Sequence, residues 1–213
     1  MAFVCLDVGN VLVHVDFNVF IRDLSKQLNI TLEEAEYFMN RTHSLHDMGL
    51  TQMSDELRDH FKIRSPLIIE GLLDSWNKVI SPNADIINRM SSMMTTHNLQ
   101  VALLSNVGLE HTVQMARVLD IDSFFDNCVK HLSCQVGARK PTKLYYQSFL
   151  MQHPEFQGAA YLDDLQENLD AAVPFGFRPK RFSLQEHKPL DIYLDSIEEF
   201  ILQDNSEQNS RRH

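Results

Sequence analysis

The 213-residue chain has little of several features that mark particular protein classes. Its three cysteines cannot form a disulfide framework, so we expect a reducing, cytoplasmic environment, with Cys5 and Cys128 buried as small apolar side chains. Its apolar runs are far shorter than the ~20 residues of a membrane span, and an acidic residue at position 7 argues against a secretory signal. No HExxH pattern and no cysteine–histidine spacing suited to zinc is present.

Positive charge is also scarce. The 19 Lys and Arg residues face 29 Asp and Glu residues, which gives a net charge of −10. No basic block offers the footprint that a nucleic-acid backbone or an anionic membrane requires, so neither is expected as a partner. The hydrophobic fraction of 44% is that of an ordinary globular chain, and the length suits one core with one sizeable insertion.

Short apolar runs alternate with amphipathic helical patterns over most of the chain. Between Asp16 and Ser81, by contrast, only helical spacing occurs, including a capping box of Thr31 and Glu34. Ser-Pro pairs at 65–66 and 81–82 are each predicted to begin a helix. Strands are predicted near residues 2–6, 101–104, 127–130, 159–162 and 178–182.

This order predicts an α/β fold with a parallel sheet and right-handed crossovers, and an all-helical cap inserted after the first strand. The predicted catalytic core comprises residues 1–15 and 82–203, and the cap comprises residues 16–81. Residues 204–213 are polar and aperiodic, and are predicted to form a disordered tail.

Polar residues follow the predicted strands at several points. In a parallel sheet the carboxyl ends of the strands share one edge, where ligands bind. Asp7, Asp163 and Asp164 would meet there, and like charges that close need a cation or a proton between them. Carboxylate oxygens favour Mg²⁺. Ser105 and Asn106 end a third strand, and a loop at 137–141 precedes a helix.

These residue types suit phosphoryl transfer. A carboxylate such as Asp7 can attack phosphorus to form an acyl phosphate, and Lys140 supplies positive charge to the nucleophile and the phosphoryl oxygens. Ser105 and Asn106 can donate hydrogen bonds to those oxygens. Taken singly, each residue has a simpler interpretation as a helix cap, a turn residue or a solvated loop. The occurrence of all of them in this order is what indicates a site.

Four segments resemble the motifs of the haloacid dehalogenase-like (HAD) superfamily of hydrolases. The first is residues 7–12, DVGNVL, and the last is residues 161–168, YLDDLQEN. The similarity covers about residues 2–182, and favours the branch of the bacterial α-glucose-1-phosphate phosphatases and the N-terminal phosphatase domain of mammalian soluble epoxide hydrolase. The other matching positions are 103–106, 133–141 with Tyr146, and Trp76, Asn77 and His111.

This resemblance implies a Rossmann-like core with a helical cap. It also implies Mg²⁺-dependent hydrolysis of a small phosphomonoester, such as a sugar phosphate, through an aspartyl phosphate on Asp7. The implied metal ligands are Asp7, the Gly9 carbonyl and Asp164. The other implied roles are support of the metal shell or of Lys140 by Asp163, charge balance by Lys140, phosphoryl binding by Ser105 and Asn106, and ordering of the last motif by Asn168.

One position departs from the family pattern. Most phosphatases of the superfamily carry a second Asp two residues after the nucleophile, where it protonates the leaving group and then activates water. That position is Gly9 here. Asp16 and His14 are the nearest substitutes, although a helix cap and a solvent-facing histidine are simpler interpretations of them.

Substrate specificity is expected to come from a polar break in the cap pattern just before Gly49. Its residues are His43, Ser44, His46 and Asp47. Closing the cap over the site would exclude water and strengthen its electrostatics. A solvent-exposed helix end is the alternative interpretation of this break.

Two rival functions stay open. A 2-haloacid dehalogenase also lacks the second Asp, but it uses no metal and has no need of adjacent acids at Asp163 and Asp164. A lapsed phosphatase that only binds a phosphorylated metabolite or a protein is the other rival, and the presence of Asp7, Lys140 and Asp164 argues against it. The sequence does not name the substrate or the oligomeric state.

Overall fold

The computed structural model describes residues 2–121, 123–186 and 189–203. Five strands form one parallel sheet in the order β5-β4-β1-β6-β7. β1 lies between β4 and β6, so the polar residues that follow these three strands are neighbours at one edge of the sheet. The strands are β1 (Ala2–Leu6), β4 (Leu99–Ser105), β5 (Val129–Leu132), β6 (Ala160–Asp163) and β7 (Arg178–Arg181).

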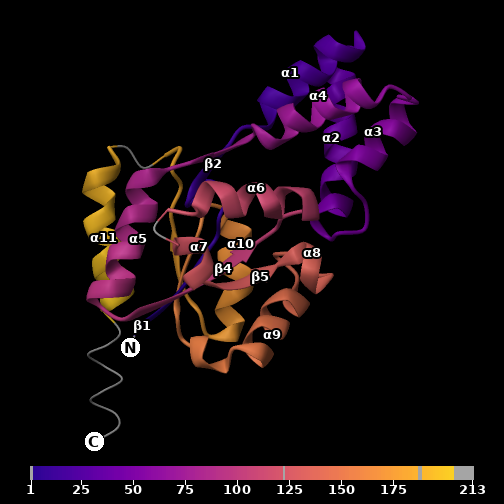
Figure 1. The fold of residues 1–213 in the computed structure, drawn as a ribbon. Coiled ribbons are helices and arrows are strands. Elements are labelled where there is room, and N and C mark those ends of the chain that lie inside the picture. The colour runs from indigo at the N-terminus through magenta and orange to yellow at the C-terminus, as the bar shows by residue number, and fades with distance from the viewer. Residues whose placement is uncertain (1, 122, 187–188, 204–213) are drawn as a thin grey trace, which may run out of the picture.

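Helices cover both faces of the sheet, and each face has its own apolar core (Figure 1). Val4 and Leu6 of β1 pack with α5 (Ala84–Thr96) and α11 (Leu190–Leu202). Cys5, which lies between them, packs with α9 (Lys143–Gln152) and α10 (Gln166–Ala172) on the other face. Burial on both faces explains why β1 is a continuous apolar run. Cys5 and Cys128 are buried, as predicted.

Four helices form the cap and extend away from the sheet, in indigo to magenta in Figure 1. They are α1 (Phe17–Leu28), α2 (Leu32–Asp47), α3 (Met53–Phe61) and α4 (Pro66–Asn77). The predicted capping box begins α2, because Thr31 Oγ1 accepts a hydrogen bond from the Glu34 N–H at 3.1 Å and Glu34 Oε2 accepts one from the Thr31 N–H at 2.9 Å. Phe20, Phe38 and Trp76 are buried inside the cap.

Two short strands that the sequence pattern did not predict connect the cap to the sheet. β2 (Val13–Val15) and β3 (Ile80–Pro82) pair antiparallel, so the predicted helix start at positions 81–82 is wrong. Strands of three residues are too short to show a periodicity. α5 begins after Asn83 instead, because the Asn83 side chain accepts a hydrogen bond from the Ile86 N–H at 3.3 Å.

One further long helix is α6 (Leu109–Leu119). The short helices are α7 (Phe124–Asn127), α8 (Ser133–Val136) and the 3₁₀ turns at Pro154–Phe156 and Val173–Phe175. No helix among the described residues is both long and apolar enough to span a membrane. The predicted tail at 204–213 lies outside the described residues, and the limits of core and cap stay predictions.

Candidate active site

Asp7 comes directly after β1 and is held by a buried lysine. Its backbone N–H donates to the Leu162 carbonyl of β6 at 2.9 Å, which fixes the end of the strand. Lys140 Nζ lies 2.8 Å from Asp7 Oδ1 and 2.7 Å from Asp163 Oδ2. Lys140 is only 1% exposed, so these two carboxylates replace water as partners of its charge. They raise the pKa of Lys140, although burial alone would lower it.

Three carboxylates gather at this edge of the sheet. One oxygen from each of Asp7, Asp163 and Asp164 lies within 4.8 Å of the other two. Burial raises the pKa of Asp7 to about 7, with Lys140 opposing this and the two other acids adding to it. Burial and the charge of Asp163 also raise the pKa of Asp164. The acids therefore carry more negative charge than Lys140 neutralises, and an oxygen-ligated divalent cation such as Mg²⁺ fits the cluster.

The two adjacent acids have different surroundings. Asp163 is fully buried, and its carboxylate accepts hydrogen bonds from Lys140, the Leu165 N–H at 2.9 Å, Asn168 Nδ2 at 2.9 Å and the Tyr161 hydroxyl. Asp163 thus contacts Lys140, and support of Lys140 is one of the two roles that the resemblance implies for it. The Asn168 side chain donates to Asp163, and its carbonyl accepts a hydrogen bond from the Tyr146 hydroxyl at 2.8 Å, while its role in ordering this segment stays a prediction. Hydrogen bonds of this kind between separate segments hold the Lys140 side chain in one position.

Asp164 is partly exposed and contacts a residue to which the sequence gave no role. Asn10 Nδ2 donates to Asp164 Oδ2 at 3.2 Å, while Asn10 Oδ1 accepts from the Val15 N–H at 3.3 Å and from Gln185 Nε2 at 3.0 Å. Asn10 has a φ of 54°, a left-handed conformation that asparagine adopts more readily than most residues. Its place in the DVGNVL segment was the signal that could have found it. Asn10 ties Asp164 to the strand that leads into the cap.

Ser105 and Asn106 end β4 beside this cluster. Ser105 is buried and lines the same cavity as Asp7. The Asn106 side chain donates to the Lys140 carbonyl at 3.0 Å and accepts from the Lys140 N–H at 2.8 Å. Asn106 therefore links its own loop to the Lys140 loop, and phosphoryl binding by Ser105 and Asn106 stays a prediction.

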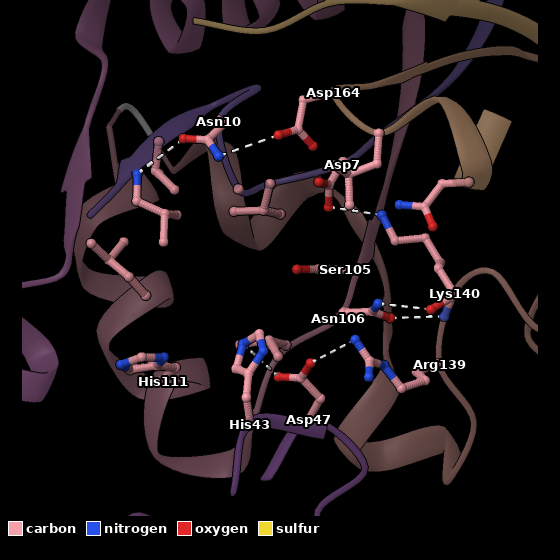
Figure 2. A pocket seen from close by; sticks show the side chains of 18 of the residues that line it. Asp7, Asn10, His43, Asp47, Ser105, Asn106, His111, Arg139, Lys140 and Asp164 are labelled. Atoms are coloured by element: carbon pink, nitrogen blue, oxygen red, sulfur yellow. Dashed lines mark hydrogen bonds and ion pairs between the residues drawn. The ribbon is translucent and has the colours of Figure 1, made fainter. Parts of the chain in front are cut away.

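A cavity of about 250 Å³ opens between this edge and the cap. Figure 2 shows Asp7 and Asp164 at one end of it and His43, Asp47 and Arg139 at the other, with Ser105 between them. Apolar side chains from both units complete the wall. They are Val8, Val13, Val15, Phe17, Ile80, Val107 and Leu165.

The polar groups at the cap end form one network. Arg139 Nη2 lies 3.3 Å from Asp47 Oδ2, and Asp47 Oδ1 lies 3.6 Å from His43 Nε2. Arg139 Nη1 also donates to Ser44 Oγ at 2.7 Å. Asp47 and Ser44 thus bind the core through Arg139, a residue of the 137–141 loop to which the sequence analysis gave no role of its own.

Five predicted residues do not line this cavity, which are Ser44 and Asp163, whose contacts are given above, and His46, Asp16 and His14. His46 is 1% exposed and pairs with Glu110 of α6 at 3.2 Å, so the expectation that it faces substrate is wrong. Asp16 caps α1 by accepting from the Asn18 N–H at 3.0 Å. His14 points to the other side of β2 from Val13 and Val15 and contacts Asn83 Nδ2 at 3.2 Å. The simpler interpretation of Asp16 holds, and neither residue is placed to replace the missing acid at Gly9.

The space around position 9 does not require a glycine. A Cβ at Gly9 would meet only Val15 Cγ2, at an ordinary 3.5 Å. The second acid is therefore absent although the backbone leaves room for a side chain. Coordination of a cation by the Gly9 carbonyl stays a prediction.

No protein-family model and no curated protein matches the chain. Solved structures do match it. A HAD family enzyme from Bacteroides thetaiotaomicron superposes with a TM-score of 0.77 at 16% identity, over 91% of this chain and 98% of that one. A predicted HAD-like family hydrolase from Porphyromonas gingivalis gives 0.70 at 18% identity, over 91% and 96%. The chain has the HAD fold. An L-2-haloacid dehalogenase shares this fold less closely, with a TM-score of 0.59 at 16% identity over 86% and 85% of the two chains.

Proposed function

We propose that this chain is a Mg²⁺-dependent hydrolase of small phosphomonoesters that acts through an aspartyl phosphate on Asp7. The observation that carries the proposal is the contact of Asp7 with Lys140 inside a cluster of three carboxylates. The Bacteroides thetaiotaomicron enzyme has been solved in complex with magnesium and inorganic phosphate, at a TM-score of 0.75 and 17% identity, which supports this choice. The cavity suits a phosphate with a small organic group.

In this mechanism Asp7 attacks phosphorus, and the leaving oxygen departs on the opposite side, toward the cap. Lys140 balances the charge of Asp7 and of the phosphoryl oxygens, while its two carboxylate contacts prevent it from moving. Ser105 donates to the phosphoryl group from the wall of the cavity. Bound Mg²⁺, held by Asp7 and Asp164, would supply further positive charge to the phosphoryl oxygens. Water then hydrolyses the aspartyl phosphate and frees Asp7.

The dehalogenase alternative has its own support, since dehalogenases share the fold and Gly9 carries no second acid. Attack on carbon with loss of halide needs no cation, however. The partly exposed Asp164, next to Asp7 and Asp163, would then add only repulsion to the site. The carboxylate cluster therefore favours phosphoryl transfer over halide displacement.

The test is phosphate release from a panel of small phosphomonoesters, with Mg²⁺ and with excess chelator. We expect turnover with Mg²⁺ alone, and Asp7→Asn should abolish it, because an amide is not a nucleophile although it fills the same space. Asp170→Asn, on the exposed face of α10, is the matched control and should keep full activity.

Three results would contradict the proposal. The first is full phosphatase activity in Asp7→Asn or in excess chelator. The second is release of halide from a 2-haloacid without Mg²⁺, in the absence of any phosphatase activity, which would support the dehalogenase. The third is binding of phosphate esters without turnover of any of them, which would indicate a lapsed enzyme.

A further inference from the structure

The proposed hydrolysis needs a group that protonates the leaving oxygen, and Gly9 cannot supply a proton. The acid must reach the cavity on the side of the phosphoryl group away from Asp7, since the leaving oxygen departs opposite the nucleophile. Asp16 and His14 do not line the cavity. The acid must therefore come from another part of the cavity wall.

Most ionisable groups in that wall are already committed or do not titrate near neutral pH. Asp7, Lys140 and Asp164 belong to the nucleophile and cation end, and Arg139 stays protonated. His111 stacks on Trp76 with ring centroids 4.0 Å apart, and its Nε2 donates to the Trp76 carbonyl at 3.0 Å. Burial lowers the pKa of His111 to about 4, so it is neutral at pH 7. Among the described residues of the wall, His43 and Asp47 are left.

His43 has the surroundings of an oriented acid–base group. It belongs to α2 of the cap, and its ring packs edge-on against Phe17, with centroids 5.0 Å apart. Its Nε2 faces the buried carboxylate of Asp47, which is itself held by Arg139. No described residue is hydrogen-bonded to the other ring nitrogen, Nδ1. The Asp47 carboxylate, 3.6 Å from Nε2, favours a proton on that nitrogen and leaves the other nitrogen available for proton transfer.

Figure 2 shows where this pair lies. His43 and Asp47 stand across the cavity from Asp7, and Ser105 lies between the two ends. A phosphoryl group seated at Asp7 and Ser105 therefore has its leaving oxygen directed toward the cap end. His43 reaches that end with 36% of its side chain exposed, enough for contact with a ligand.

We propose that His43 is the general acid–base residue of the proposed phosphatase, supplied by the cap in place of the absent second Asp, and that Asp47 positions it. In the first step, Asp7 forms a bond to phosphorus while the bond to the ester oxygen breaks, and protonated His43 gives its proton to that oxygen. In the second step, neutral His43 accepts a proton from water as the water attacks phosphorus and releases Asp7. The alcohol and inorganic phosphate leave, and His43 is protonated again.

The charge of His43 depends on what the cavity holds. The protein's own groups place the pKa of His43 below its ordinary value, because burial lowers it more than Asp47 raises it and Arg139 and His46 lower it further, with His111 also nearby on α6. A phosphate dianion bound in the same cavity favours the protonated ring, and its departure as product favours the neutral ring. The proton is thus available when the ester is bound. Because His43 belongs to the cap and lines the cavity, proton transfer depends on the cap lying over the site, as exclusion of water does.

This inference rests on the proposed function, and its test separates the two. The experiment measures kcat/KM for 4-nitrophenyl phosphate and for an alkyl phosphate with Mg²⁺, in the wild type, His43→Gln and His14→Gln. Nitrophenolate is a good leaving group without a proton, whereas an alkoxide must be protonated as it leaves. We expect His43→Gln to lose about 10²–10³-fold on the alkyl ester, with kcat/KM for the aryl ester nearly unchanged. The aryl ester should also give a burst of nitrophenolate, because hydrolysis of the aspartyl phosphate then lacks its base.

The controls keep the inference falsifiable. His14→Gln makes the same change outside the cavity and should leave both esters unaffected. For Asp47→Asn we expect a partial loss confined to the alkyl ester, since Asp47 only positions the ring. Free imidazole should restore alkyl turnover to His43→Ala, which a structural role would not permit. If His43→Gln loses kcat/KM equally for both esters, or if imidazole restores no activity, the role of His43 is refuted and the proposed function is not. No phosphate release by the wild type would refute the proposed function itself.

Discussion

Two buried basic residues of the core show how surroundings decide whether a side chain keeps its charge. Lys140 has two carboxylates within 2.8 Å, so its ammonium remains charged although it is buried. His131 is 2% exposed, but its Nε2 faces two neutral groups, the Tyr145 carbonyl and Ser148 Oγ, both at 3.1 Å. Burial therefore lowers the pKa of His131 to about 4. The first arrangement keeps a positive charge inside the candidate site, and the second makes stability depend on pH.

The stability of the protein should fall as the pH drops from 7 toward 4, partly because of His131. An unfolded histidine binds a proton near pH 6.5, whereas the folded His131 binds one only near pH 4, so unfolding takes up a proton between these values. The loss due to one such histidine is up to about 2 kcal/mol at pH 5, at about 1.4 kcal/mol per pH unit. Urea unfolding of the wild type and His131→Gln at pH 7.5 and 5 measures it.

His131→Gln should show a smaller difference in unfolding free energy between the two pH values, whatever its stability at pH 7.5. His60→Gln changes an exposed histidine of the cap and should keep the wild-type difference. If His131→Gln and the wild type lose the same stability between pH 7.5 and 5, the folded His131 takes up its proton at the same pH as the unfolded one, and the stated pKa is wrong.

At the scale of elements, the cap and the sheet are joined by more than their two connecting strands. Glu110 of α6 accepts hydrogen bonds from the Met53 N–H at 2.6 Å and the Ser54 N–H at 3.4 Å. A side chain of the core therefore binds the free N–H groups at the start of α3 in the cap. The same carboxylate pairs with His46 at 3.2 Å. Gly108, just before α6, makes room for that imidazole, since a Cβ there would lie 2.0 Å from His46 Cε1.

Gly108→Ala should therefore disturb the joint between cap and core. His46 would have to leave its place against Glu110 and Trp76, and overpacking of this kind costs ~1–3 kcal/mol. We expect the loss in urea unfolding, together with a higher KM from looser closure of the cap. Gly71→Ala, inside α4, is the control, because its nearest neighbour is the flexible end of Gln27 at 3.4 Å and alanine favours helix. Equal stability of both variants would show that His46 does not occupy this position.

Elements and site residues were predictable where one segment of sequence carried the whole signal. The buried strands appear as apolar runs, and Asp7, Asp163 and Asp164 follow directly from their ends. The capping of α3 was not predictable, because Glu110 lies 57 positions from Met53 and only the fold brings them together. Sequence analysis placed His46 beside Asp47 at the substrate, yet neighbours in a helix point about 100° apart.

At the scale of the whole molecule, two effects of negative charge oppose folding. One is the repulsion within the carboxylate cluster, and the other is the net charge of −10. Cap and core share one continuous apolar cluster, so a local gain in stability at the site should raise the unfolding temperature of the whole chain. A cation bound to the folded state alone provides such a gain. Mg²⁺ can stabilise the protein in two ways, by binding at the cluster or by general screening of its negative charge.

Thermal unfolding with and without Mg²⁺ separates these sources. At a Mg²⁺ concentration 100 times its dissociation constant, site binding adds about 2.7 kcal/mol, which for a chain of this size raises Tm by about 5–10 °C. Asp164→Asn removes a partly exposed carboxylate from the cluster and should lose most of that rise. Glu167→Gln removes the same charge from an exposed position on α10 and should keep it. If all three proteins gain equally, or if NaCl of equal ionic strength gives the same rise, Mg²⁺ acts on the net charge, and the carboxylate cluster is not its site.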